Sequence, residues 1–218
     1  MDDDRDRAWA VDLLAEVDRT FARTGAATPG WPDPWPERDA PQAAYSRVTD
    51  PGRHRILDAR LAAWEEVLVD RGLARVERPE ALTWVPSPRL PQLGGQPTLL
   101  VPTAPGALTF VAVSAAAGDL PVLEVGARAP DTGAALLDVH PACGCDACDS
   151  GSADLLQVLD ASVLTVVRGG VVLVRAGRRE VARTWDGWAA SGVADPAWLG
   201  DPTAAPEGAL VVRGAPWL

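Results

Sequence analysis

Three stretches of this chain repeat hydrophobic residues at helical spacing. The first covers residues 4–23, where Ala10, Leu14, Val17 and Phe21 fall on one side of a helix. Its acidic start suits the positive N-terminal end of the helix dipole. We therefore expect an amphipathic helix near the N-terminus that packs through this stripe.

The second helical stretch has clear start and stop signals. Asp50 is expected to cap this helix and Pro51 to take its first position, while Gly72 ends it. The buried stripe is predicted to be Leu57, Leu61, Trp64 and Leu68. Basic residues gather around its start and either bind an anion at free backbone N–H groups or pair with Asp50 and Asp58; these residues are Arg47, Arg53, His54 and Arg55.

The third helical stretch is expected to begin with Ser152 as its cap and to end at Gly169-Gly170. Its apolar face comprises Leu156, Leu159, Val163 and Val166. Before this helix the pattern is typical of strands, which we place at residues 82–85, 98–102, 108–113, 122–127 and 134–140. A hairpin is predicted after it, with strands at residues 171–175 and 180–184.

These elements predict one α+β domain over residues 1–218. Short connections between strands favour a mainly antiparallel sheet, with the helices packed on one face. Residues 26–44 form a connector rich in proline and tryptophan, in which Trp31 and Trp35 either anchor a surface segment or bind a peptide. Residues 186–218 are expected to be a loop-rich C-terminal segment.

Composition excludes several function classes. The formal net charge is −10, which disfavours nucleic acid and anionic membranes as partners. The acidic N-terminus is no signal peptide and no apolar run is long enough to span a bilayer, so we expect a cytoplasmic protein. The chain has no lysine, which removes pyridoxal-phosphate chemistry and the phosphate-loop motif.

The candidate chemistry is concentrated in one short loop before the third helix. His140, Cys143, Cys145 and Cys148 have the spacing His-x2-Cys-x-Cys-x2-Cys, and these cysteines are the three of the chain. Thiolate and imidazole are ligands for zinc-like metals, and Cys145-x2-Cys148 is a zinc-type knuckle. We predict a structural metal site with zinc as its ion and these four residues as ligands. Because the set is so compact, His54 or a carboxylate is the alternative fourth ligand.

Three other interpretations of the loop stay open. Cys145 and Cys148 are spaced like the pair of a thiol-dependent redox enzyme. A metal hydrolase site would need an open coordination position and a nearby base. In the third interpretation the loop is a packed turn with no site. An enzyme should show a pocket that combines the loop with polar groups such as Asp138, Arg47 or His54, whereas a structural site should be closed and packed.

The run from Cys143 to Ser152 reads CGCDACDSGS and is followed by Leu155 and Leu156. It resembles the signature of an uncharacterised actinobacterial family, a domain of unknown function. The upstream run of residues 45–51, YSRVTDP, and the downstream Asp-Gly-Trp at residues 186–188 are similar to that family too. The resemblance implies one domain over most of the chain, and it implies no activity, cofactor or catalytic residue.

Overall fold

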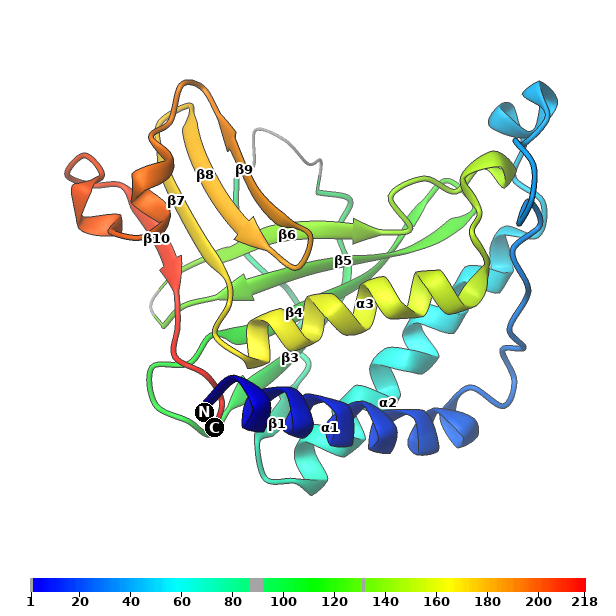
Figure 1. The fold of residues 1–218 in the computed structure, drawn as a ribbon, viewed down its shortest axis with the longest axis horizontal. Helices are drawn as coiled ribbons and strands as arrows, with labels where there is room; N and C mark the ends of the chain where they lie inside the picture. Colours follow the sequence, from blue (N-terminus) through cyan, green and yellow to red (C-terminus); the bar gives the residue numbers. More distant parts are fainter. Residues whose placement is uncertain (1, 87–91, 131) are drawn as a thin grey trace.

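The computed structural model describes residues 2–86, 92–130 and 132–218, and its long helices lie together beneath a sheet (Figure 1). These helices are α1 (Asp2–Thr24), α2 (Ile56–Asp70) and α3 (Gly151–Val167). Short 3-10 helices lie in the connections, namely η1 (Gln42–Ser46), η2 (Pro51–Arg55), η3 (Asp146–Cys148), η4 (Pro196–Leu199) and η5 (Pro202–Ala204). No described helix has the length and apolar character needed to cross a membrane.

A six-stranded sheet forms the second layer, in the order β1-β3-β4-β5-β6-β2. Its strands are β1 (Ala74–Glu77), β2 (Trp84–Val85), β3 (Gly95–Pro102), β4 (Thr109–Ala117), β5 (Leu120–Arg128) and β6 (Ala134–His140). Neighbouring strands are antiparallel, apart from β2, which pairs in parallel with the start of β6. The predicted α+β class with a mainly antiparallel sheet is confirmed.

A second sheet of four antiparallel strands follows α3, in the order β10-β7-β8-β9. Its strands are β7 (Val172–Ala176), β8 (Arg179–Thr184), β9 (Gly187–Ser191) and β10 (Leu210–Arg213). The predicted hairpin corresponds to β7 and β8. The hydrophobic pattern does not separate the two sheets, and it misses β9 because four of the five residues of that strand are exposed.

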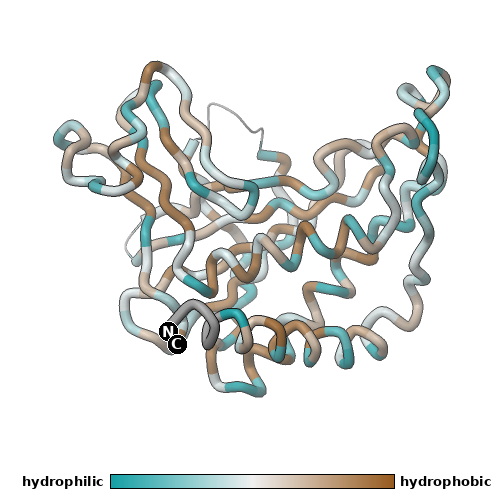
Figure 2. Tube along the Cα trace, viewed as in Figure 1, coloured by the Kyte–Doolittle hydropathy of each residue, from teal (hydrophilic) through white to brown (hydrophobic). Residues whose placement is uncertain are grey.

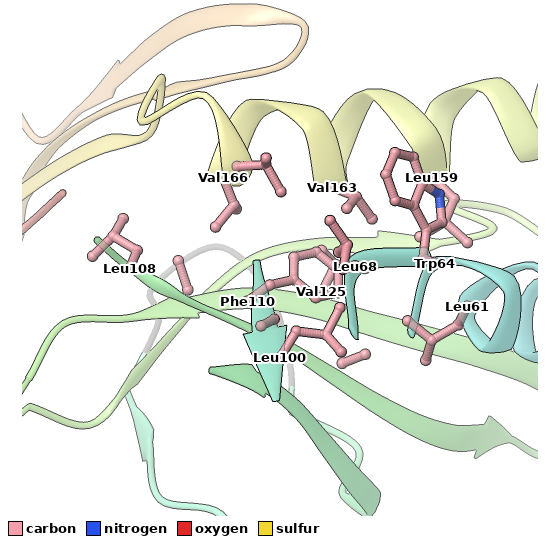
Figure 3. Packing of buried hydrophobic residues seen from close by; sticks show 14 of the residues in the cluster. Leu61, Trp64, Leu68, Leu100, Leu108, Phe110, Val125, Leu159, Val163 and Val166 are labelled. Atoms are coloured by element: carbon pink, nitrogen blue, oxygen red, sulfur yellow. The ribbon is translucent and has the colours of Figure 1, made fainter. Parts of the chain in front are cut away.

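The main core lies between the helices and one face of the six-stranded sheet (Figure 3). Hydrophobic positions recur along α3 and through the central strands that meet it (Figure 2). The residues labelled in Figure 3 are at most 4% exposed: Leu61, Trp64, Leu68, Leu100, Leu108, Phe110, Val125, Leu159, Val163 and Val166. This packing confirms the predicted stripe of the second helix and the placement of helices on one sheet face.

Asp50 takes the predicted position before Pro51 but does not cap through its side chain, the predicted cap at Ser152 is wrong, and the predicted stops hold. Asp50 has a left-handed backbone (φ 50°) and makes no capping hydrogen bond, and the 3-10 helix η2 separates it from α2. Ser152 lies within α3 and is buried, so its hydroxyl is used elsewhere. Gly72 and Gly169, with φ values of 69° and 67°, follow α2 and α3 in the conformation that favours glycine.

Candidate functional site

The thiol loop, residues 141–150, joins the end of β6 to the start of α3. It runs beside the segment of residues 30–50 that leads from α1 to α2 (Figure 1). Cys143 and Cys148 are exposed and Cys145 is half-buried, and all three are free thiols. The loop therefore presents its sulfur atoms at the surface, between a strand end and a helix start.

The three thiols form one cluster. Their sulfur atoms all lie within 4.8 Å of one another, and Cys143 Sγ is 3.3 Å from Cys145 Sγ. Zinc–sulfur bonds of about 2.3 Å in a tetrahedron place sulfur atoms roughly 3.8 Å apart. Within the described ranges, this is the group of potential ligand residues close enough to share one ion, and His140 is not part of it. The structure thus brings the three predicted thiol ligands together.

Gly144 lies between the first two thiols, at a position that has no room for a side chain. A Cβ atom at this position would lie 2.3 Å from Cδ2 of Leu120, which begins β5. The loop backbone therefore packs directly on the Leu120 side chain, and glycine keeps Cys143 and Cys145 at their short separation.

Hydrogen bonds within the cluster make the pKa values of the thiols differ. The Cys143 and Cys148 thiols donate to Cys145, which lowers the pKa of Cys145 below its usual range. The same bond to Cys145 raises the pKa of Cys148 to about 12. One thiol of the cluster is thus favoured as a thiolate, the form that binds metals and attacks disulfides.

Asp146 fixes the middle of the loop from inside. Its carboxylate accepts hydrogen bonds from Arg47 Nε (2.5 Å), Thr49 N (2.7 Å) and Thr49 Oγ1 (2.8 Å). The Arg47 and Thr49 donors lower the pKa of Asp146 to about 2. Trp35 Nε1 donates to the Asp146 carbonyl at 2.8 Å, so the connector clamps the same residue.

Asp149 fixes the end of the loop in the same way. Its side chain accepts from Trp31 Nε1 (2.9 Å), Arg53 (2.7 Å) and the Gly151 N–H (2.9 Å). Ser152, the predicted cap, instead accepts from Trp31 N at 3.0 Å and donates to Trp31 O at 3.1 Å. The loop is therefore held at its middle and at its end by contacts that involve no thiol.

These contacts show which acids pair with two of the four basic residues around the start of the second predicted helix. Arg47 and Arg53 pair with Asp146 and Asp149, and not with the Asp50 and Asp58 partners that the sequence suggests. Sequence reasoning missed these acids because they lie almost a hundred residues away. The contacts of Trp31 and Trp35 agree with the predicted anchoring of the connector, but the sequence did not indicate that their indole N–H groups donate to Asp149 and to the Asp146 carbonyl.

His140, the remaining predicted ligand, is turned toward α3. Its ring is 2% exposed, and Nε2 lies 3.1 Å from Ser162 Oγ and 3.9 Å from Asp138 Oδ2. Burial lowers the pKa of His140. Because serine and aspartate meet the same nitrogen, these residues do not form a catalytic triad, which uses both ring nitrogens. The fourth-ligand assignment of His140 stays a prediction.

A cleft of about 400 Å³ adjoins the thiols. All three cysteines line it, together with His54, Asp138 and His140. Trp185, from the turn between β8 and β9, closes one side and donates Nε1 to Asp138 Oδ2 at 3.1 Å. The loop thus borders a pocket that includes Asp138 and His54, two of the polar groups expected there of an enzyme, whereas Arg47 is not among the residues that line it.

Comparison with known proteins gives one match. Residues 17–217 match the family described as Family of unknown function (DUF6226). No curated protein and no solved structure matches this chain. The match covers the thiol loop, the clamping connector and the cleft, but it brings no activity with it.

Proposed function

Since this chain belongs to DUF6226, a family without an assigned function, we propose a function from its own site: the protein binds one soft divalent metal ion through Cys143, Cys145 and Cys148. The supporting observation is that the three sulfur atoms already lie within 4.8 Å of one another. Thiolates select soft or borderline ions, and zinc is the ion we infer. The proposal keeps the predicted thiol ligands and the predicted metal.

We infer that the metal is accessible and does not hold the fold together. A structural zinc site is closed, and its loop depends on the ion. Here Asp146 and Asp149 hold the loop through bonds to Arg47, Thr49, Trp31 and Arg53, and the thiols border a cleft. This arrangement favours a site with three thiolate ligands and a fourth position facing the cleft, filled by His140, His54 or water.

Metal content is the first test. Protein purified without a metal-affinity tag and kept reduced is expected to carry roughly one zinc ion per chain. Cys143→Ser, Cys145→Ser and Cys148→Ser should each raise the zinc Kd at least about tenfold, as loss of a ligand does. Ala142→Ser is the matched control, because it adds a hydroxyl to an exposed position of the same loop and leaves the thiols in place. Three reactive thiols and no metal in the wild type would contradict the proposal.

Hydrogen exchange after chelation separates an accessible from a structural ion. The Asp146 N–H donates to Arg47 O at 2.8 Å and the Ser152 N–H to Trp31 O at 3.0 Å. We call the bonds of Asp146 and Asp149 to Arg47, Thr49, Trp31 and Arg53 the frame of the loop. If this frame holds the loop, both amides stay protected from exchange when a chelator removes the metal. Loss of protection at both amides would show that the ion is structural, as a closed zinc site requires.

A second candidate function is thiol–disulfide exchange. It is favoured by the lowered pKa of Cys145 beside Cys148. In that reaction the Cys145 thiolate attacks a disulfide of another molecule, forms a mixed disulfide with one of its sulfur atoms and expels the other as a thiolate. Cys148 then loses its proton and attacks Cys145 Sγ, which breaks the mixed disulfide, releases the second thiolate and leaves a Cys145–Cys148 disulfide. The expected sign is a reversible Cys145–Cys148 disulfide in metal-free protein, formed as one disulfide of the substrate is reduced per chain.

A further inference from the structure

The cleft beside the thiols has an apolar body. Leu155 and Val158 of α3 line it together with Pro141 and the Trp185 indole. Its volume of about 400 Å³ falls within the range of small-molecule sites. Trp185 is 38% exposed, so part of this side chain is open to solvent. These walls suit a small molecule with an aromatic or aliphatic body.

His54 contributes a hydrogen-bond acceptor to this cleft. Its Nδ1 lies 3.2 Å from the Pro51 carbonyl, which only accepts, so Nδ1 carries the hydrogen. In the neutral form of the ring the other nitrogen carries no hydrogen. Nε2 is therefore the unprotonated nitrogen, and it accepts hydrogen bonds.

His140 contributes a second acceptor by the same reasoning. Ser162 has one hydroxyl hydrogen, which it donates to the Val158 carbonyl at 3.1 Å. The contact between His140 Nε2 and Ser162 Oγ, at 3.1 Å, then requires the imidazole to donate. Nδ1 of His140 is left without a hydrogen and accepts.

The charges that line the cleft are negative. Asp138, Asp149 and Asp154 are among its residues, and no arginine of the described chain is. Asp149 is neutralised by Arg53 at 2.7 Å. The Asp138 carboxylate is 30% exposed and faces the donor of Trp185. An anionic ligand would be repelled by these carboxylates and would find no donor on the acceptor nitrogens. A cationic ligand with N–H groups would be attracted to the same carboxylates and could donate to the nitrogens.

From these walls we propose that the cleft binds a small organic amine with an apolar body. The ammonium group offers N–H donors to Asp138 and to the acceptor nitrogens of His54 and His140, and the Trp185 ring attracts the cation through its π face. Amine binding goes beyond the proposed metal binding and does not require it, because Asp138 and Trp185 lie outside the proposed set of metal ligands.

The test compares three probes that differ in one group. 2-Phenylethylamine, 2-phenylethanol and 3-phenylpropionate share a phenylethyl body and carry a cation, a neutral hydroxyl and an anion. Calorimetric titration of the reduced full chain at pH 7.5, first metal-free and then zinc-loaded, measures the three dissociation constants. We expect the amine to bind at least about tenfold more tightly than the alcohol, since hydrogen bonds to charged groups are the stronger ones. The carboxylate is expected not to saturate the protein.

Two variants assign the binding to this cleft. Asp138→Asn keeps an oxygen that accepts the Trp185 N–H but removes the charge, so the Kd of the amine should rise about tenfold. Trp185→Leu should raise this Kd about fivefold through loss of the cation–π contact. Asp186→Asn and Trp188→Leu are the matched controls, because both residues line a neighbouring cleft and not this one.

The proposal is overturned if the carboxylate binds as tightly as the amine, if the amine does not bind, or if Asp138→Asn leaves the Kd of the amine unchanged. The probe comparison uses the wild-type chain and stands even if a variant fails to fold. A chain that binds the amine but no zinc would refute the metal proposal alone. A chain that binds zinc but no amine would refute this inference alone.

Discussion

Two groups of ionisable side chains lie along α3, and they differ in how completely the protein satisfies them. In the core, Asp160 accepts from Arg60 Nε (2.9 Å), Arg60 NH2 (2.6 Å) and Trp64 Nε1 (2.7 Å). At the N-terminal end, the three thiols contact one another and remain accessible. The first group is closed, while the second is open to any ion or ligand that enters the cleft.

The cost of desolvation explains this difference. A buried charge is tolerated only when it is paired and hydrogen-bonded, so the Arg60–Asp160 pair leaves nothing for a ligand. Exposed thiols carry no such cost and need no partners beyond one another. The loop combines both states, because the buried carboxylate of Asp146 is saturated while the sulfur atoms beside it are not. Polar groups whose hydrogen bonds are all made within the protein therefore hold the fold, and groups that lack such partners are available for function.

The largest expected effect is at the closed group. Asp160→Ala leaves Arg60 buried without its main partner and Trp64 Nε1 without an acceptor, so the free energy of unfolding should fall by about 3–5 kcal/mol. Gln157→Ala, at an exposed position of the same helix, is the control and should change it by less than about 0.5 kcal/mol. Urea unfolding measures both. A loss below about 1 kcal/mol would mean that Asp18, the other partner of Arg60, is sufficient.

A smaller effect is expected where the frame of the loop is broken. Asp149→Ala leaves Trp31 Nε1 and Arg53 without their acceptor and should lower the free energy of unfolding by about 1–3 kcal/mol. Because Asp149 follows Cys148 directly, zinc affinity should fall as well, about tenfold. Asp39→Ala, at an exposed acid of the connector, should change neither quantity. Lower stability with unchanged zinc affinity would show that the frame does not order the thiols.

Packing under the thiols gives a third, smaller effect. Gly144→Ala forces a methyl group against the end of the Leu120 side chain and should cost about 1 kcal/mol, with weaker zinc binding. Leu120→Ala makes room for that methyl group, so the double variant should regain most of the zinc affinity of the Leu120→Ala protein. If the two substitutions add independently, the contact between the loop and β5 does not position the thiols.

Periodicity predicts the parts of this molecule that depend on hydrophobic burial. The stripe from Leu57 to Leu68 follows the expected pattern because the helix buries one face. The strand ending at His140 and the β7–β8 hairpin are predictable because short apolar runs lie between turn signals. The thiol group is also predictable, since its members lie within six residues. The saturated partners are not, because Arg60 and Asp160 are one hundred positions apart.

The predicted caps failed for a related reason. Serine and aspartate before a helix indicate a cap only when the backbone places their oxygen over free N–H groups. At Ser152 the connector supplies a better partner, since the backbone N–H and C=O groups of Trp31 both bond to the hydroxyl. Local sequence does not show that a segment more than a hundred residues earlier passes over this helix start.

Asp50 gives the smallest effect and tests how the frame of the loop is shaped. The residue sits between Thr49, which bonds Asp146, and Pro51, whose carbonyl accepts from His54, and its φ of 50° is left-handed. Glycine adopts this conformation without strain, so Asp50→Gly should leave the free energy of unfolding unchanged or raise it by up to about 1 kcal/mol. Asp50→Ala should lower it by about 1 kcal/mol, because alanine is strained there. A helix cap predicts another order, with aspartate more stable than glycine and glycine more stable than alanine. Thermal unfolding of the three proteins distinguishes the two orders of stability. If the protein with aspartate were the most stable, Asp50 would act as a helix cap after all. The left-handed backbone at Asp50 would then not explain how Thr49 reaches Asp146.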